Sequence, residues 1–306
     1  MPYYAGIDGG QTTTTAVVGD ESGKILGRGE AGPADEIGQG PESTRLRDAL
    51  QAALSEAMSR ANLPADTQLE RVVAGVSGYE GHVYGQSPAL PARAFAIVHD
   101  SEIAHAGALA GDYGVVVIAG TGSVAFGKGE RGTSFVGGWG YVFGDEGSGF
   151  WFTREALAQA MRDFDAGVPN DITPLALKHF AKRTLRELAR AFYANEISRA
   201  KLAHFGVELL AAAQRGNARA AELVQKGAVA LVTLAVHAAV RAGLPADTKV
   251  AFTGGVKRSP TVRAQIAQCM HSMLPNAQLA PPKYDAATGA LIMAYRASGM
   301  SPEITP

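Results

Sequence analysis

An aspartate at a strand end and a glycine-threonine turn after it are the residues best suited to chemistry. Asp100 follows an apolar strand end, and the turn 120–123 (Gly-Thr-Gly-Ser) follows the unbroken apolar run 115–119. A carboxylate placed in this way can act as a general base, and glycine-rich turns expose backbone N–H groups that bind phosphate. The stretch predicts a base, a short crossing helix over 101–110 and a phosphate cradle.

A structural interpretation of the same residues stays open at this point. Asp100 can simply cap the helix that follows it, and the glycines can simply turn a hairpin between two strands. The stretch alone does not decide between these interpretations, so the rest of the chain is needed.

A second glycine turn lies near the N-terminus. A strand over 3–8 ends at Asp8, Gly9 and Gly10, and the β-branched segment 12–18 is the expected hairpin partner. The glycines let the backbone approach an anion, and Asp8 is placed to hold Mg²⁺ through water, because Mg²⁺ favours one or two carboxylates plus phosphate oxygens. The Gly-Lys-Ser/Thr sequence of a Walker A loop is not found here.

The segment 137–149 combines six glycines with aromatic and acidic residues, among them Trp139, Asp145 and Glu146. Carboxylates accept hydrogen bonds from paired hydroxyls, and flat rings cover the apolar faces of sugars. The segment therefore indicates a sugar site. The alternative is a structural glycine loop in which Trp139 is a core residue.

Composition and charge narrow the class of protein. The 306 residues predict about two domains, and a net charge of −1 gives no sign of nucleic-acid binding. The single Cys269 excludes a disulfide within the chain and a cysteine-based zinc or iron–sulfur site built by one chain. Met1 leads directly into a strand and no apolar run approaches about 18 residues, so we expect a cytoplasmic protein without a membrane span.

Apolar periodicity places most strands in the first part of the chain and most helices in the second. The expected strands are 3–8, 12–18, 25–30, 71–76, 94–98, 115–119 and 249–253, and the expected helices are 42–61, 101–110, 153–164, 174–193, 199–215, 218–242 and 285–297. This order is typical of an α/β layer architecture. Each half begins with a strand, a glycine turn and a strand, which suggests a duplicated core.

The motifs stand in an order that resembles a known superfamily. The segments 6–10 (Gly-Ile-Asp-Gly-Gly), 119–123 (Ala-Gly-Thr-Gly-Ser) and 253–255 (Thr-Gly-Gly), with Asp100 between the first two, resemble the acetate and sugar kinase, chaperone and actin superfamily. The glycine and tryptophan pattern of 137–148 is similar to that of the N-acetylglucosamine kinase family, in the BadF/BadG/BcrA/BcrD-type ATPase group. The resemblance covers most of the chain. It implies two ribonuclease-H-like (actin-like ATPase) domains around a central cleft that holds ATP and Mg²⁺, the C-terminal domain being helix-rich.

The same resemblance implies roles for individual residues. Asp100 matches the catalytic base, and Asp8 would bind Mg²⁺ through water. The nucleotide-binding positions are Asp8, Gly9, Gly10, Thr12, Thr13, Gly120, Thr121, Gly122, Ser123, Gly254, Gly255 and Val256. The substrate-binding positions are Ser77, Gly78, Asp100, Thr121, Gly138, Trp139 and Asp145.

Two positions depart from the family pattern. Gln11 stands where the family usually has another glycine, which is a mild change. Ala34 and Asp35 stand in the loop that usually presents an asparagine to the sugar, so the identity of the amino sugar stays open.

The implied function is an ATP-dependent kinase, a transferase that phosphorylates the 6-hydroxyl of an amino sugar, with N-acetyl-D-glucosamine as the first candidate. The alternatives are a kinase for glucosamine or another hexose, and a BadF-type ATPase without a sugar substrate. ATPases of that type hold an iron–sulfur cluster between subunits, and the lone Cys269, far from every glycine turn, speaks against one here. A sugar-sensing regulator would need a DNA-binding segment before the first strand, which Met1 begins.

The resemblance also predicts the organisation of the chain. We expect an N-terminal domain over 1–110 and a C-terminal domain over 111–306 with a helical insertion, the last residues packing back on the first domain. A homodimer is the expected assembly, and no membrane or nucleic-acid partner is expected.

Overall fold

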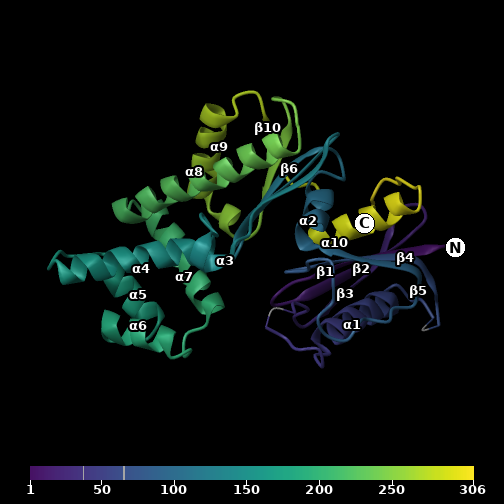
Figure 1. Cartoon of the computed structure of the whole chain (residues 1–306), viewed down its shortest axis with the longest axis horizontal. Coiled ribbons are helices and arrows are strands. Elements are labelled where there is room, and N and C mark those ends of the chain that lie inside the picture. The colour runs from purple at the N-terminus through teal and green to yellow at the C-terminus, as the bar shows by residue number, and fades with distance from the viewer. Residues whose placement is uncertain (37, 65) are drawn as a thin grey trace. The chain divides into compact units, whose positions relative to one another are not determined.

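The computed structural model describes residues 1–306 except 37 and 65 and forms two compact units (Figure 1). Unit 1 contains residues 1–116 and 281–306, and unit 2 contains residues 117–280. The chain passes from unit 1 to unit 2 between residues 116 and 117 and returns to unit 1 at residue 281. The chain enters unit 2 within a strand, and its C-terminal residues belong to unit 1.

Unit 1 is a five-stranded sheet with helices on both faces (Figure 1). Its elements are β1 (Tyr3–Gly9), β2 (Thr14–Asp20), β3 (Ile25–Ala31), α1 (Arg45–Arg60), β4 (Leu69–Val76), β5 (Ala92–His99), α2 (Asp100–Ala108) and α10 (Ala286–Ala297). The strand order is β3-β2-β1-β4-β5. The first three strands form an antiparallel meander, whereas β1, β4 and β5 are parallel. The C-terminal ends of these parallel strands consequently meet at one edge of the sheet.

The period of two along the strands divides the core of unit 1 between the two faces. Ala5 and Ile7 of β1 belong to the apolar cluster that contains Leu50 of α1. Tyr4, which points to the other face, belongs to the cluster that contains Leu291 of α10. Burying each large apolar side chain in this way stabilises the fold by roughly 1.5–3 kcal/mol.

Helix α10 lies directly on the backbone of β1 and α2. A Cβ atom at Gly6 would lie 2.1 Å from the amide nitrogen of Leu291, and one at Gly289 would lie 2.0 Å from the carbonyl oxygen of Ile103. No side chain larger than that of glycine fits at either position. This contact fixes the end of the chain on the sheet that carries Asp8.

Unit 2 repeats the strand order of unit 1. Its strands are β6 (Gly114–Ala119), β7 (Ser123–Gly129), β8 (Gly132–Gly137), β9 (Lys249–Thr253) and β10 (Gln278–Ala280). The order β10-β9-β6-β7-β8, taken from its far edge, matches that of unit 1 strand for strand. The duplicated core that the sequence suggested is confirmed, although β8 and β10 were not predicted.

The remaining elements of unit 2 are helical. They are α3 (Gly140–Phe143), α4 (Gly149–Asp165), α5 (Ile172–His179), α6 (Leu185–Tyr193), α7 (Arg199–Gln214), α8 (Ala218–Arg241), the short 3₁₀ helix η1 (Val256–Arg258) and α9 (Pro260–Met273). The prediction of one helix over 174–193 is wrong. Ala181 adopts a left-handed conformation with φ of 52°, and the Thr184 hydroxyl accepts the Glu187 N–H and starts α6 anew.

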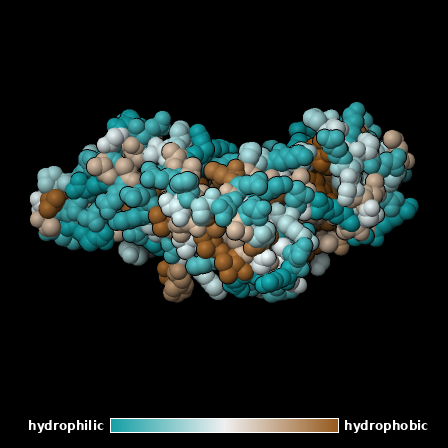
Figure 2. All heavy atoms as spheres, turned by 90° about the horizontal axis from the view of Figure 1, so that it is seen from above, coloured by the Kyte–Doolittle hydropathy of each residue, from teal (hydrophilic) through white to brown (hydrophobic). Residues whose placement is uncertain are grey.

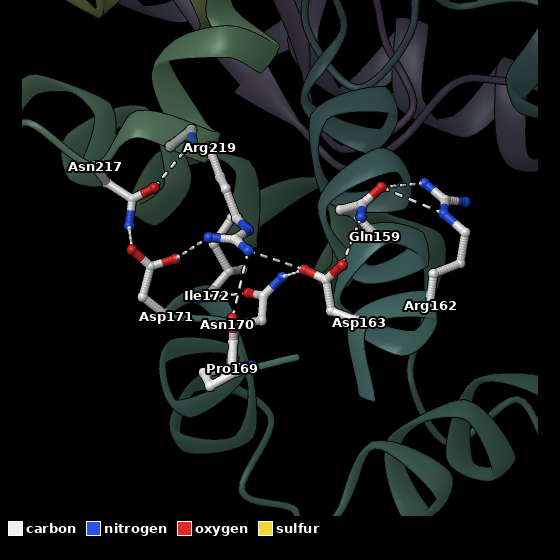
Figure 3. Close-up of polar contacts among 10 residues, drawn as sticks. Gln159, Arg162, Asp163, Pro169, Asn170, Asp171, Ile172, Asn217 and Arg219 are labelled. Atoms are coloured by element: carbon white, nitrogen blue, oxygen red, sulfur yellow. Dashed lines mark hydrogen bonds and ion pairs between the residues drawn. The ribbon is translucent and has the colours of Figure 1, made fainter. Parts of the chain in front are cut away.

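Polar contacts connect three of these helices (Figure 3). Arg219 of α8 forms ion pairs with Asp163 of α4 and with Asp171, which directly precedes α5. The side-chain amide of Asn170 donates to Oδ2 of Asp163 at 2.7 Å, and this hydrogen bond is the main cause of the lowered pKa of Asp163. These ion pairs connect α8 with the C-terminal part of α4 and with the start of α5.

Among the described residues, one helix, α8, is long and apolar enough to cross a membrane by length and composition. It packs against α7, α9 and β7 within unit 2, and Leu231 and Val232 are fully buried. On the face drawn in Figure 2, hydrophilic residues predominate and hydrophobic residues form separate patches.

The close approach of α10 yields a stability prediction. We expect Gly289→Ala to lower the free energy of unfolding by about 1–3 kcal/mol, because the added methyl group overpacks against the α2 backbone. Gly40→Ala is the matched control, since a Cβ there meets nothing within 4 Å. Chemical denaturation measures both variants, and equal midpoints for Gly289→Ala and the control would contradict the packing argument.

Candidate active site

The parallel strand ends of unit 1 bring three predicted site residues to one sheet edge. Asp8 on β1 pairs with Gly75 on β4, and Val76 at the end of β4 pairs with His99 at the end of β5. Ser77 and Asp100 are the next residues along their segments, and the Ser77 N–H donates to the carbonyl oxygen of Gly9 at 2.9 Å. The sheet therefore gathers Asp8, Ser77 and Asp100.

Asp8 lies in an unfavourable electrostatic environment. Burial, together with the negative charges of Asp100 and Asp285, raises the pKa of Asp8 from 3.8 to about 7. An excess of negative charge at a largely buried carboxylate suits a divalent cation. Within the described part of the chain, no three His, Cys, Asp or Glu side chains are arranged to bind a metal.

In the structure, Asp100 is not the residue that caps α2. The residue that caps α2 is His99, whose Nδ1 accepts the Ser101 N–H at 3.2 Å. Asp100 occupies the first helical position, and its Oδ1 lies 2.9 Å from the same Nδ1. The interpretation of Asp100 as merely a cap is wrong. Its carboxylate, with a side chain 30% exposed, is accessible to a ligand.

Asp285 is a charged neighbour of Asp8 that was not predicted. It caps α10 by accepting the Thr288 N–H at 2.8 Å, and its carboxylate pairs with Arg28 of β3 at 2.6 Å. The sequence carries one signal for it, an aspartate directly before the last helix. Its effect on Asp8 depends on the packing of α10 and could not be read from that signal.

The first glycine turn and the loop after β3 are joined by backbone contacts. The Gly10 N–H donates to the carbonyl oxygen of Thr13, and the Ala34 N–H donates to the carbonyl oxygen of Gly10, each at 3.0 Å. Thr12 and Thr13 are exposed at the turn. Ala34 is fully buried and Asp35 pairs with Arg45 at 3.3 Å.

The second turn, 120–123, opens β7 in unit 2 and is held by the segment that precedes α4. The Ser123 N–H donates to Asp145 Oδ1 at 3.1 Å, and the Ser123 hydroxyl donates to the Glu146 carbonyl at 2.8 Å. The Gly149 N–H completes the clasp by donating to the Gly120 carbonyl at 2.8 Å. Thr121, at the tip of the turn, is partly exposed.

Asp145 is almost completely buried, with an exposed fraction of 4%. Its second oxygen, Oδ2, lies 3.1 Å from Nη2 of Arg199, so both carboxylate oxygens have protein partners. Its predicted contact with sugar stays a prediction. Arg199 was not predicted, because its only sequence signal is a position at the start of a helix.

The aromatic loop between β8 and α4 presents its rings to solvent. Trp139 is 77% exposed and Phe143 is 84% exposed, so the alternative that Trp139 is a core residue is wrong. Gly138 precedes this tryptophan with φ of 71°, a conformation that favours glycine. The loop includes the single helical turn α3, where no helix was predicted.

The third glycine turn follows β9. Gly254 has φ of 90°, and a Cβ there would lie 2.4 Å from the carbonyl oxygen of Ala119. Gly255 is exposed, and Val256 is buried at the start of η1. The turns after β6 and β9 are therefore neighbours within unit 2.

The predicted site residues form two groups. The described part of unit 1 carries Asp8, Gly9, Gly10, Thr12, Thr13, Ser77, Gly78 and Asp100, and that of unit 2 carries Gly120, Thr121, Gly122, Ser123, Gly138, Trp139, Asp145, Gly254, Gly255 and Val256. Each group lies on turns at the ends of strands. The roles of these residues in binding and catalysis stay predictions.

Two α/β units with the same strand order and glycine turns at the strand ends define an actin-like ATPase fold. The model of the BadF/BadG/BcrA/BcrD ATPase family matches residues 5–294, and the chain belongs to this family. Membership of an ATPase family indicates that the chain uses ATP.

Three comparisons cover nearly the whole chain. An N-acetylmuramic acid/N-acetylglucosamine kinase of Clostridium acetobutylicum is 26% identical over 96% of this chain and 98% of its own length. An N-acetyl-D-glucosamine kinase of Dictyostelium discoideum is 24% identical over 95% and 97%. A structural genomics target from Chromobacterium violaceum has a TM-score of 0.79 at 24% identity, with coverage of 96% and 99%. The last comparison supports the fold.

The raised pKa of Asp8 yields a prediction on stability against pH in metal-free protein. Because the folded state holds the Asp8 proton up to about pH 7 and the unfolded state releases it near 3.8, stability is lost as the pH rises between these values. Asp8→Asn removes this loss. We expect its Tm to exceed that of the wild type by several degrees at pH 8 and by much less at pH 4.5. A Tm difference that is the same at both pH values would contradict the assigned environment.

Proposed function

We propose that this protein is an ATP-dependent kinase that phosphorylates the 6-hydroxyl of an amino sugar, with N-acetyl-D-glucosamine as the first candidate substrate. The observation that carries the proposal is the accessible carboxylate of Asp100 beside Asp8 at the edge of the unit 1 sheet. The two curated relatives, which are both amino-sugar kinases by name, support the substrate class.

In the proposed reaction, Asp100 accepts the proton of the 6-hydroxyl as the oxygen attacks the γ-phosphorus of ATP. The bond from the γ-phosphorus to the bridging oxygen breaks, and ADP leaves. Phosphoryl transfer has a loose transition state, so positioning and charge stabilisation contribute most. The N–H groups of the turns 9–13 and 120–123 would bind the phosphates, and Mg²⁺ at Asp8, when bound, would neutralise part of their charge.

The aromatic loop and the loop after β3 bear on the choice of sugar. Trp139 is exposed on the aromatic loop and is available to cover the apolar face of a sugar ring. Ala34 is buried and Asp35 is paired with Arg45, so neither of these two residues offers a side-chain amide to a substrate. Glucosamine, N-acetylmuramic acid, N-acetylmannosamine and glucose are therefore the substrates to compare with N-acetylglucosamine.

The ATPase without a sugar substrate is the alternative within the same family. Cys269 is the only cysteine of the sequence and is largely buried in α9, where burial raises the pKa of its thiol. A buried, protonated thiol is poorly suited to bind iron. This observation favours the kinase over an iron–sulfur ATPase.

A substrate screen tests the proposal. We expect ATP consumption with Mg²⁺ to rise strongly when an amino sugar is added, with the highest kcat/KM for N-acetylglucosamine. A coupled assay of ADP release over the five sugars measures this. ATP consumption that no sugar increases would contradict the proposal and favour the ATPase.

A substitution tests the assigned base. Asp100→Asn keeps the size of the side chain but cannot accept a proton, so we expect kcat to fall by about 100-fold or more while the KM for sugar changes little. Asp165→Asn, at the exposed end of α4, is the control for loss of an aspartate charge. Turnover near that of the wild type in Asp100→Asn would contradict the assignment of Asp100 as the base.

A further inference from the structure

Arg199 occupies a position that local helix energetics disfavour. It is the first residue of α7, directly after Ser198, whose hydroxyl caps the helix by accepting the Lys201 N–H. A cation in the first turn faces the positive end of the helix dipole, which is unfavourable. A compensating interaction is therefore expected, and its partners indicate what the residue does.

The partners of Arg199 lie on the aromatic loop between β8 and α4 and in the first turn of α4. Nη2 lies 3.1 Å from Oδ2 of Asp145, and Cζ lies 5.0 Å from the ring centroid of Tyr141 and 5.9 Å from that of Phe150. Tyr141 and Phe150 themselves meet edge to face at 5.0 Å. The guanidinium is thus held between a carboxylate and two rings, a setting that suits arginine better than lysine.

The carboxylate of Asp145 contacts both Arg199 and the turn 120–123, and so links the two. Oδ1 accepts the Ser123 N–H, and a Cβ at Gly122 would lie 2.8 Å from both carboxylate oxygens. The carboxylate therefore packs directly against Gly122, where no Cβ fits. Its position depends on Arg199, because an unpaired carboxylate is costly to bury and Arg199 is the partner on its other side.

We propose that Arg199 is a positioning residue that holds the turn 120–123 in its phosphate-binding conformation through Asp145, and holds the aromatic loop through Tyr141. The effect on turnover rests on the proposed kinase function, whereas the effect on nucleotide binding does not. Nε of Arg199 is buried and has no hydrogen-bond partner among the described residues. The guanidinium is therefore held by Nη2 and by its flat faces, and both features are lost in methionine.

Three variants and a control test the proposal. Arg199→Met removes the positive charge and the planar, branched guanidinium but keeps a long apolar side chain. Arg199→Lys keeps the positive charge but loses the planar guanidinium. Arg199→Met/Asp145→Asn also removes the buried negative charge, while the Asn oxygen can still accept the Ser123 N–H. Arg190→Met, at an exposed position of α6, controls for the loss of a surface arginine. Calorimetry with Mg²⁺ and a nonhydrolysable ATP analogue, without sugar, measures nucleotide affinity in each.

We expect Arg199→Met to weaken nucleotide binding by about 10-fold or more, as the loss of one charge-assisted contact predicts. Arg199→Lys should lie between Arg199→Met and the wild type, and the double variant should recover part of the affinity lost in Arg199→Met. Arg190→Met should bind like the wild type. In steady-state kinetics, Arg199→Met should raise the KM for ATP.

Nucleotide affinity of Arg199→Met within twofold of the wild type would overturn the proposal, as would a double variant no better than Arg199→Met. Loss of the folded state in all three variants would assign Arg199 a purely structural role and also overturn it. If the wild type binds the nucleotide but phosphorylates no sugar, the kinase function fails, and the nucleotide affinities alone decide the role of Arg199.

Discussion

The constraint on which both units depend is the direct contact of backbone with backbone at glycine. At Gly6 the helix α10 lies on β1 so closely that no Cβ fits between them, and at Gly254 the turn after β9 lies against the end of β6 in the same way. These contacts leave little freedom to the strand ends. The strand ends that lead into the turns with Asp8 and Thr121 are therefore fixed by backbone packing within each unit.

The two units treat their carboxylates differently. In unit 2, Asp145 is buried with a cation on one oxygen and a backbone N–H on the other, so its negative charge is compensated. In unit 1, Asp8 is largely buried and also faces the charges of Asp100 and Asp285, which makes its ionised form costly. A fold that retains such a charge gives up stability at this edge, and this is expected where a cation and phosphates bind.

Much of the fold could be predicted because the strands have clear periodicity and the turns have distinctive residues. The apolar run before Asp100 placed this residue at a strand end, and the repeated glycine turns indicated the duplicated core, which the strand order confirms. The break between α5 and α6 could not be predicted, because a left-handed Ala181 leaves no mark in the apolar spacing. Strands β8 and β10 are short and partly exposed, so their alternation is weak.

Candidate site residues that belong to a sequence motif could be predicted, whereas those that depend on tertiary packing could not. Asp8, Asp100 and the three turns follow from residue types in order along the chain. His99 as the cap of α2, Asp285 as a neighbour of Asp8 and Arg199 as the partner of Asp145 depend on contacts that sequence spacing does not encode. The last of these joins residues 54 positions apart.

The central claim is that the γ-phosphoryl group of ATP is transferred to a sugar hydroxyl and not to water. ³¹P NMR of a reaction with Mg·ATP and N-acetylglucosamine observes both products in one spectrum. The account predicts a phosphomonoester signal that grows as ATP is lost and is split by the two methylene protons at C6. Inorganic phosphate as the sole new signal besides ADP, at the same rate with and without sugar, would contradict it.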